Sequence, residues 1–415
     1  MMKKVTDWLE KKLVPFSNKL NANIWIQTIR DSILQITPFI FLGSIFSFLG
    51  VITEFTGVQL YGYALSDWTF GKISLFIAFL IPFNYCEKKR LKPLRIMAGA
   101  TSLILFLMMI TPEYEISQVV GFGSGTLGAT GMVSAMVAGI FTANVMNLFK
   151  DFSFFKKDSA IPNFIKEWFD LMLPTGVVVI IGFILTFALK INLFALIEQA
   201  FAPFKNGMEM IPVYMLFKFV WVALFAMGLS PWLLTGIWTP VALANIAANA
   251  ALVAAGTATP ELLSIVTKEV DNIYISIGGT GATLGLNLLF LFCAKSKRLK
   301  VLGKTSIVPS LFCINEPIVF GSVVWNPLLM IPFCLTAFAL PFTTWLFTKV
   351  ICLFPIPTYV FNLYFIPAPI LSFMTTGTFR SVIFTLLQMG LSALIYYPFF
   401  KVYDKQELQK ELEGE

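Results

Sequence analysis

Carboxylates, imidazoles and thiols do most of the proton, metal and nucleophile chemistry in proteins, and this chain lacks one of them entirely. Its 415 residues contain no histidine. This excludes histidine-based acid–base catalysis, histidine metal sites, histidine-dependent nucleophiles and a phosphohistidine relay within this polypeptide. The five cysteines have no Cys-x-x-Cys spacing and lie mostly in or beside apolar segments, which is typical of small core residues. We therefore predict no catalytic residue, no metal and no cofactor.

Glu316 is the residue whose surroundings point most clearly to a binding role. It is the only acidic residue between Asp271 and Asp404, and it lies within the apolar stretch 312–320. A carboxylate inside a membrane is costly unless it faces a polar cavity or a partner. A plainer role is a helix N-terminal acid stabilised by the macrodipole, since Pro317 can open a helix. The two are compatible, because a carboxylate at a half-helix start can accept hydrogen bonds from a neutral polyol.

Two glycine-rich stretches and one arginine have competing interpretations. Residues 123–128 match the spacing of a dinucleotide-binding fingerprint, but neither a βαβ pattern nor a following acidic residue supports that function. Residues 278–285 contain a GxxxG pattern that favours close helix packing, with backbone access to a ligand as the alternative. Arg380 is either a snorkelling interfacial anchor, which we favour, or a counter-charge to Glu316.

The elements that must position these residues are membrane helices. Apolar residues make up 57% of the chain and charged residues only 13%, whereas soluble proteins have about 25% charged residues. One bilayer crossing takes about 20 helical residues, so the apolar runs predict about ten spans. The runs cover residues 33–52, 70–86, 96–110, 127–149, 171–194, 211–229, 232–254, 273–293, 318–347 and 381–400.

The loop charges orient these spans. The basic residues gather near the N-terminus, in loops 87–92, 150–157 and 295–304, and after Lys401. With ten spans and both termini in the cytoplasm, every basic cluster lies on the cytoplasmic side, as the positive-inside rule requires. The net charge of +7 is explained in this way, and nucleic-acid binding is not expected.

Two stretches do not match a plain crossing. Residues 305–317 are apolar but short, and residues 350–374 carry four prolines. Non-helical backbone at membrane depth must be buried in protein or line a wet cavity, so both predict re-entrant or broken elements. The alternatives are a surface loop and a kinked interfacial helix. Residues 1–20 have apolar residues at helical spacing among lysines, which predicts an amphipathic helix on the cytoplasmic face. The predicted fold is an all-α polytopic membrane protein.

Four stretches, together covering motifs from the second half of the chain, resemble a known family. They are similar to the membrane-spanning IIC components of the phosphoenolpyruvate-dependent sugar phosphotransferase system, in the lactose, cellobiose and diacetylchitobiose branch, and the likeness extends over nearly the whole chain. The stretches are GGTGATL at 278–284, AKSKRLK at 294–300, INEPIVFG at 314–321 with Asn326-Pro327, and IYYPFFKVYDKQ at 395–406.

The resemblance implies a domain organisation and a set of partners. It implies a homodimeric, multi-pass protein of the bacterial cell (inner) membrane, in contact with lipid. A cytoplasmic helix at 1–20 would precede a dimerisation half at 21–170, a substrate-transport half at 171–403 and a charged cytoplasmic tail at 404–415. The sugar would be phosphorylated at the cytoplasmic face by a separate, phosphorylated IIB protein, so the chain itself would be a transport component and not an enzyme.

The resemblance also implies a sugar site, with two departures from the family pattern. Glu316, with Asn315, would bind sugar hydroxyls near the phosphorylated position. The family's Gly-Ile-His-Gly motif corresponds to 228–231, where Ser230 replaces the histidine with a shorter hydrogen-bonding group. The family's tryptophan ahead of a proline pair is replaced by Phe365 or Ile366, and a phenyl ring can stack on a pyranose but has no indole donor. Together with Arg380, these are the predicted substrate-binding residues.

The leading hypothesis is a permease that carries a β-linked disaccharide of the cellobiose or diacetylchitobiose type by alternating access. One alternative is a non-phosphorylating facilitator or proton-coupled transporter. Proton coupling usually needs several buried titratable groups, and the candidate site of this chain offers a single glutamate and no histidine. Another is a degenerate or regulatory membrane protein that binds sugar without coupled transport.

Overall fold

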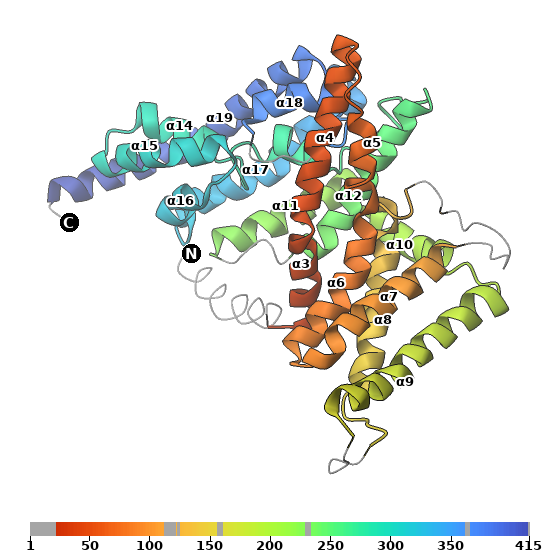
Figure 1. Ribbon diagram of the computed structural model, residues 1–415. Helices are drawn as coiled ribbons and strands as arrows, with labels where there is room; N and C mark the ends of the chain where they lie inside the picture. Colours follow the sequence, from red (N-terminus) through yellow and green to blue (C-terminus); the bar gives the residue numbers. More distant parts are fainter. Residues whose placement is uncertain are drawn as a thin grey trace. The chain divides into compact units, whose positions relative to one another are not determined.

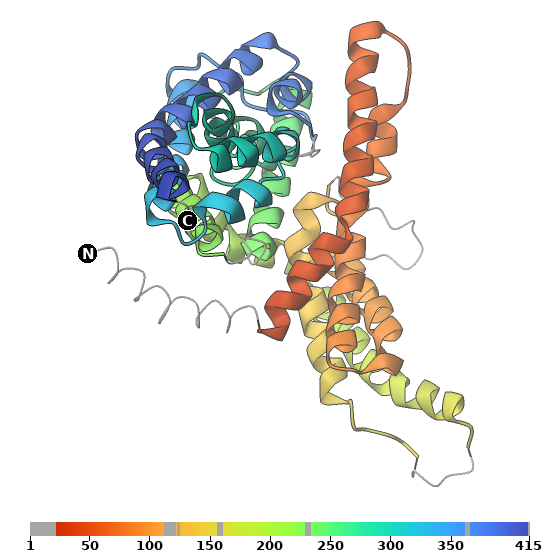
Figure 2. The same cartoon turned by 90° about the vertical axis from the view of Figure 1, so that its left-hand side faces the viewer.

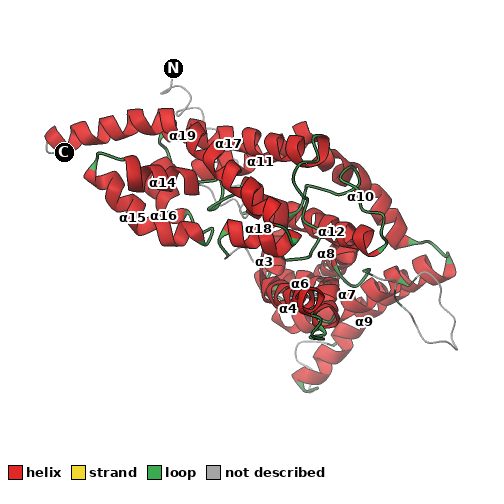
Figure 3. Cartoon of the chain, turned by 90° about the horizontal axis from the view of Figure 1, so that it is seen from above, coloured by secondary structure: helices red, strands yellow, loops and turns green. Residues whose placement is uncertain are grey.

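All regular secondary structure in the part of the chain that the structure describes is helical. The computed structural model describes residues 22–111, 122, 125–155, 161–228, 234–361 and 366–413. Helices and connecting loops account for all of these residues, with no strand among them (Figure 1, Figure 3). The predicted all-α class is thus confirmed. The predicted amphipathic helix at 1–20 lies outside the described residues.

The chain divides into two compact units, which are described separately. The N-terminal unit comprises Leu20–Pro203 and Thr235–Pro240, and the C-terminal unit comprises Phe204–Leu234 and Val241–Glu415. Whether one unit serves dimerisation and the other transport remains a prediction. The helices that begin in the N-terminal unit are α3 (Ile24–Gln35), α4 (Thr37–Thr56), α5 (Gly62–Asp67), α6 (Ile73–Lys88), α7 (Arg95–Ile110), α8 (Met132–Leu148), α9 (Asn163–Phe183) and α10 (Leu193–Glu209), together with α12 (Thr235–Ala254), which continues into the C-terminal unit.

In the N-terminal unit α6 packs against α3, α7 and α8. Its polar residue Asn84 is buried, and the Asn84 amide nitrogen donates to the Ser32 hydroxyl of α3 at 2.9 Å. Lys88, at the end of α6, pairs with Asp31 of α3 at 2.5 Å. Buried polar groups are stable only when they have such partners. These contacts fix which faces of α3 and α6 meet.

Four helices of the C-terminal unit share one apolar core: α11 (Ile211–Ala226), α14 (Leu284–Cys293), α17 (Pro327–Trp345) and α19 (Phe379–Glu413). Large core residues come from each helix, so the helices are held as one body. The core includes Phe225, Phe290, Phe333, Tyr396 and Phe400. The other α-helices that begin in this unit are α13 (Lys268–Val270), α15 (Lys297–Leu311), α16 (Glu316–Ile318) and α18 (Ala368–Thr376).

The described helices confirm a polytopic membrane protein but not the predicted ten spans. Six helices are long and apolar enough to cross a membrane, or seven if α10 and α11, which bend by 85° at their junction, form one span. The helices α7 and α14 are apolar but shorter. The six are Gly62–Lys88, Ala129–Leu148, Asn163–Ala188, Thr235–Ala254, Pro327–Val350 and Phe379–Glu413.

The predicted span at 273–293 is wrong as a single helix. The backbone forms a π-helical turn over Asp271–Ile275, then a loop, and only then α14. The 10 residues of α14 span about 15 Å, half of a bilayer core of about 30 Å. The reason is local, because Gly278, Gly279 and Gly281 all have positive φ angles and interrupt the helix.

The stretch predicted to be broken at 305–317 belongs to a helical hairpin. The Asn287 amide of α14 donates to the Ser310 hydroxyl of α15 at 2.9 Å, while Gly303 lies against the backbone of 290–291. These contacts make α14 and α15 antiparallel, and Figures 1 and 2 show the teal hairpin beside the blue helix α19. After α15 the chain turns at Cys313, whose φ is 59°, and α16 starts at Glu316.

Within the proline-rich stretch at 350–374, residues 351–361 have no regular helix, whereas α18 (Ala368–Thr376) begins inside the stretch. Side chains of the C-terminal unit satisfy the backbone there. Tyr274 donates to the carbonyl of Pro355 at 3.0 Å, and Asn249 donates to the carbonyl of Pro357 at 3.1 Å. The amide of Phe361 donates to Glu269 at 3.2 Å. Irregular backbone in a membrane protein requires such internal partners, so this stretch is built into the unit.

Candidate functional site: the Asn-Glu-Pro motif on a glycine-rich loop

Glu316 lies at the first position of α16, directly after the buried Asn315. Its side chain is exposed within this single chain. No lysine or arginine of the described residues forms an ion pair with it. An acceptor-only carboxylate with unused lone pairs suits a ligand that offers hydroxyl donors. The contact of Glu316 with sugar hydroxyls stays a prediction.

Asn315 attaches the motif to the glycine-rich loop. Its side chain is only 4% exposed. The amide nitrogen donates to the carbonyl of Thr280 at 2.7 Å and to the hydroxyl of Thr283 at 2.9 Å. Both amide hydrogens are therefore used within the protein, and only the side-chain oxygen remains for a ligand. Asn315 holds its neighbour Glu316 in place, whatever else it contacts.

The loop at 278–283 is held from the C-terminal helix. Tyr396 and Ser392 of α19 donate to the carbonyls of Gly281 and Ala282, each at 2.7 Å. Thr283 donates to the carbonyl of Gly278 at 2.9 Å, which closes the loop on itself. Each of these groups is buried, where an unpaired carbonyl would be costly. These hydrogen bonds hold the loop at 278–283 in one position. We call the loop the seat of Asn315, because the Asn315 side chain binds to it.

Gly279 allows the loop backbone to approach the Asn315 side chain closely. Its φ is 103°, a conformation that residues with a side chain rarely adopt. A Cβ at this position would lie 2.7 Å from the amide nitrogen and oxygen of Asn315. Residues 278–285 have two interpretations, close packing and backbone access for a ligand. At Gly279 the structure shows close packing of the loop on the Asn-Glu-Pro motif.

Arg380 does not serve as a counter-charge to Glu316 in this structure. Its guanidinium donates to the carbonyl of Leu353, and it forms no ion pair with a carboxylate of the described residues. The exposed position at the start of α19 agrees with an anchor. Its contact with sugar stays a prediction, and Ser230 and Phe365 lie outside the described residues.

Sequence reasoning missed an ion pair between Lys218 of α11 and Asp271, which lie 2.6 Å apart. Lys218 is the only charged residue in the 16 residues of α11. That alone was a signal, because an ionisable residue inside an apolar span marks a functional or structural partner. Its partner is 53 positions away and was not visible from spacing.

Glu269 is a second carboxylate that the sequence did not single out. It is fully buried, and one carboxylate oxygen accepts from the Phe361 amide while the other has no hydrogen-bond partner among the described residues. It lies outside the helices long enough to span a membrane. Burial raises the pKa of Glu269 to about 7. Its observed role is to hold the proline-rich stretch.

Acidic residues of α19 cap the turn between α14 and α15. Asp404 accepts from the backbone amides of Lys295 and Ser296 at 2.9 Å. Glu411 accepts from the Ser296 hydroxyl at 2.6 Å and from the amide of Arg298 at 2.9 Å. These are the orphan donors of a helix N-terminus, which carboxylates stabilise. A hydrogen bond to Glu407 also raises the pKa of Arg298 above its usual value.

Replacing Asp404 with alanine is expected to lower the free energy of unfolding by about 1–3 kcal/mol, because two partly buried amides lose their acceptor. The melting temperature of the detergent-solubilised protein measures this effect. Asp151→Ala is the matched control, since Asp151 is 90% exposed and its nearest cation is 3.8 Å away. Equal melting temperatures for the two variants would contradict the capping role.

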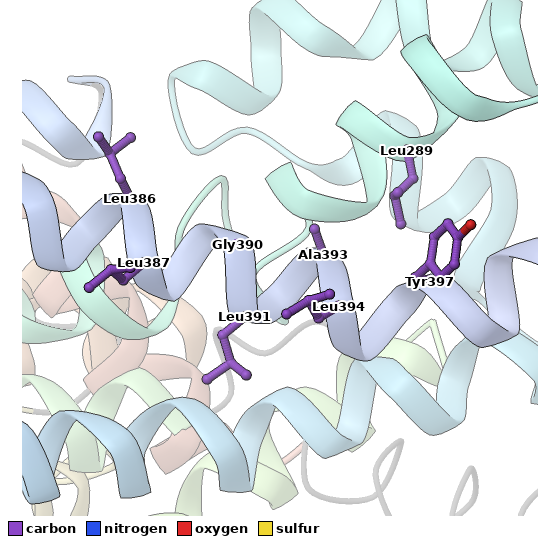
Figure 4. A pocket seen from close by; sticks show the side chains of 8 residues that line it. All are labelled: Leu289, Leu386, Leu387, Gly390, Leu391, Ala393, Leu394 and Tyr397. Carbon is purple, nitrogen blue, oxygen red and sulfur yellow. The ribbon is translucent and has the colours of Figure 1, made fainter.

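A hollow between α14 and α19 lacks the groups that a sugar needs. Five of its eight lining residues are leucines, and the Tyr397 hydroxyl is the one polar side-chain group on its wall (Figure 4). A sugar site requires several convergent hydrogen-bonding groups, so this hollow is not the sugar site. The lining residues are Leu289, Leu386, Leu387, Gly390, Leu391, Ala393, Leu394 and Tyr397.

Comparison with known proteins decides the family. The family described as "Phosphotransferase system, EIIC" matches residues 16–337. The chain belongs to this family. EIIC components are the membrane transporter subunits of the phosphotransferase system, so this chain is a sugar permease component, and as an EIIC protein with several candidate spans it is a multi-pass protein of the bacterial cell membrane.

Individual relatives cover almost the whole chain. The lichenan permease IIC component of Bacillus subtilis is 27% identical over 99% of this chain and 96% of its own length. The oligo-beta-mannoside-specific EIIC component of the same species is 28% identical, covering 97% and 94%. The lactose-specific EIICB component of Staphylococcus epidermidis is 27% identical over 99% of this chain and 72% of its own length.

A solved structure shows the same fold. The crystal structure of the transporter ChbC, the IIC component from an N,N'-diacetylchitobiose-specific phosphotransferase system, matches with a TM-score of 0.85 and 25% identity. It covers 98% of this chain and 100% of its own. The resemblance derived from the motifs is thus confirmed at the level of family and fold.

Proposed function

We propose that this EIIC protein translocates a β-linked disaccharide, of the cellobiose or diacetylchitobiose type, for phosphorylation by a separate IIB protein. The observation that carries the proposal is the Glu316 carboxylate, which forms no ion pair with the described residues and lies on a seat made by Asn315 and the glycine-rich loop. Relatives named for lichenan, oligo-beta-mannoside, lactose and diacetylchitobiose support this substrate class.

The remaining parts of the proposal concern assembly and topology. The protein forms a homodimer in lipid, with ten membrane crossings and both termini in the cytoplasm, where the basic loops lie. Residues 21–170 serve dimerisation and residues 171–403 carry the substrate, with Ser230, Phe365 and Arg380 near the sugar. The helix at 1–20 and the tail at 404–415 lie at the cytoplasmic face, where phosphorylated IIB approaches.

The test uses membrane vesicles that contain the protein and hold phosphoenolpyruvate with the soluble phosphotransferase components on the cytoplasmic side. We expect a β-linked disaccharide such as cellobiose to appear as its phosphate, and only when IIB is present. An α-linked disaccharide such as maltose is the matched control. Accumulation of free sugar without IIB would favour a facilitator, and no binding across the sugar panel would favour the regulatory alternative.

A further inference from the structure

A buried ion pair lies at the start of the π-helical turn that leads into the glycine-rich loop. The side chain of Lys218 is 4% exposed and that of Asp271 is 14% exposed. The Lys218 ammonium lies 2.6 Å from Asp271 and 3.4 Å from the Ser276 hydroxyl. Ser276 in turn donates to Asp271 at 3.0 Å. Each charge therefore has a partner, which a buried ion requires.

The pair connects α11 to the loop through backbone as well as side chains. The amide of Ser276 donates to the carbonyl of Asp271 at 2.6 Å, and the amide of Gly279 donates to the carbonyl of Ser276 at 2.8 Å. Gly279 is the residue packed against Asn315. A continuous series of contacts thus leads from Lys218 to the residue before Glu316.

The two ends of the loop are fixed by different helices. The pair with α11 fixes Asp271, at the start of the π-helical turn that leads into the loop, and Tyr396 and Ser392 of α19 fix the exit at Gly281 and Ala282. Between them, Asn315 holds the loop from the motif side, and the Cys313 thiol lies against the backbone amides of Gly278 and Gly279. Removing one partner of the buried pair leaves an uncompensated charge that must find water. The segment before the loop would then lose its attachment to α11, while the contacts of the loop with α19 and Asn315 remain.

We propose that Lys218 and Asp271 are positioning residues for sugar binding. Their ion pair sets the entry of the glycine-rich loop, the loop seats Asn315, and Asn315 places the Glu316 carboxylate for the sugar hydroxyls. This proposal rests on the proposed role of Glu316. Neither charge contacts the sugar, since each is occupied by the other.

The experiment compares Asp271→Asn and Lys218→Met with the charge-conserving Lys218→Arg. We expect the first two to raise the half-saturating sugar concentration for coupled uptake about tenfold or more, as coupled neighbouring groups do, and Lys218→Arg to retain most of the affinity. The exchanged pair Lys218→Asp with Asp271→Lys is expected to recover part of the loss. The matched control is Asp67→Asn, because Asp67 pairs with Lys72 at 2.8 Å in the N-terminal unit.

The readouts separate positioning from simple stability. Protein amount and melting temperature are measured without sugar, and the stabilisation by cellobiose is measured separately. Lower melting temperatures with unchanged half-saturation would overturn the proposal and leave a structural pair. If Asp271→Asn gives too little folded protein, Ser276→Ala removes only the bridging hydroxyl, and the same shift in half-saturation is expected, with no shift counting against the proposal.

Failure of this proposal and failure of the proposed function give different results. Loss of uptake in Glu316→Gln with normal affinity in both Asp271→Asn and Lys218→Met refutes positioning and leaves the sugar role of Glu316 intact. Normal uptake in Glu316→Gln refutes the sugar role, and with it the positioning proposal, whatever the other variants show.

Discussion

Replacing Glu316 with glutamine is expected to abolish sugar uptake coupled to phosphorylation, with a loss of about a hundredfold or more. Hydrogen bonds to a charged acceptor contribute about 1.5–3 kcal/mol each, and a carboxylate accepting from two hydroxyls would lose most of both. Glutamine keeps the shape but replaces one acceptor oxygen with a donor. The initial rate of sugar-phosphate formation in vesicles measures the effect.

Two further variants make the Glu316 result specific. Glu167→Gln is the same chemical change at an exposed residue of α9 and is expected to leave uptake unchanged. Glu316→Asp keeps the charge but withdraws it by one methylene, so intermediate uptake is expected. Undiminished uptake in Glu316→Gln would remove this carboxylate from the mechanism.

The sequence predicted helices well wherever an apolar run is uninterrupted. The run at 96–110 became α7 at Arg95–Ile110, and the run at 211–229 became α11 at Ile211–Ala226. Such runs can satisfy their backbone only as helices in a membrane. The run at 273–293 is just as apolar but is broken, because the glycines at 278, 279 and 281 adopt positive φ angles that hydropathy does not register.

Only part of the site could be predicted, because long-range contacts leave no mark on hydropathy. Glu316 stands out because a lone acid in an apolar stretch is visible in one dimension. The partners that seat it are not, since Asn315 bonds to Thr280 35 positions away and Tyr396 bonds to Gly281 115 positions away. Long-range hydrogen bonds depend on how helices pack, and neither periodicity nor charge counts encode them. Lys218 carried a visible signal, but its partner Asp271 did not.

The second large effect is expected at Gly279, which tests the seat and not the carboxylate. In Gly279→Ala the new Cβ would lie 2.7 Å from both terminal atoms of the Asn315 amide, closer than such atoms approach. Either the loop or Asn315 must move, and both hydrogen bonds of Asn315 to the loop are then lost. We expect coupled uptake to fall about as far as in Glu316→Gln, although every polar group of the motif is still present.

Gly256→Ala separates this steric effect from backbone strain. Gly256 also has a positive φ, 68°, but a Cβ there meets nothing within 4 Å. Alanine at position 256 carries a strain of about 1 kcal/mol in the left-handed region. The φ of 103° at Gly279 lies outside that region and costs more, so both melting temperatures should fall, and that of Gly279→Ala further. Only Gly279→Ala is expected to lose uptake, and adding it to Asn315→Ala should cost little more, because the colliding amide is already gone. Normal uptake in Gly279→Ala would show that Glu316 can bind its ligand without this seat.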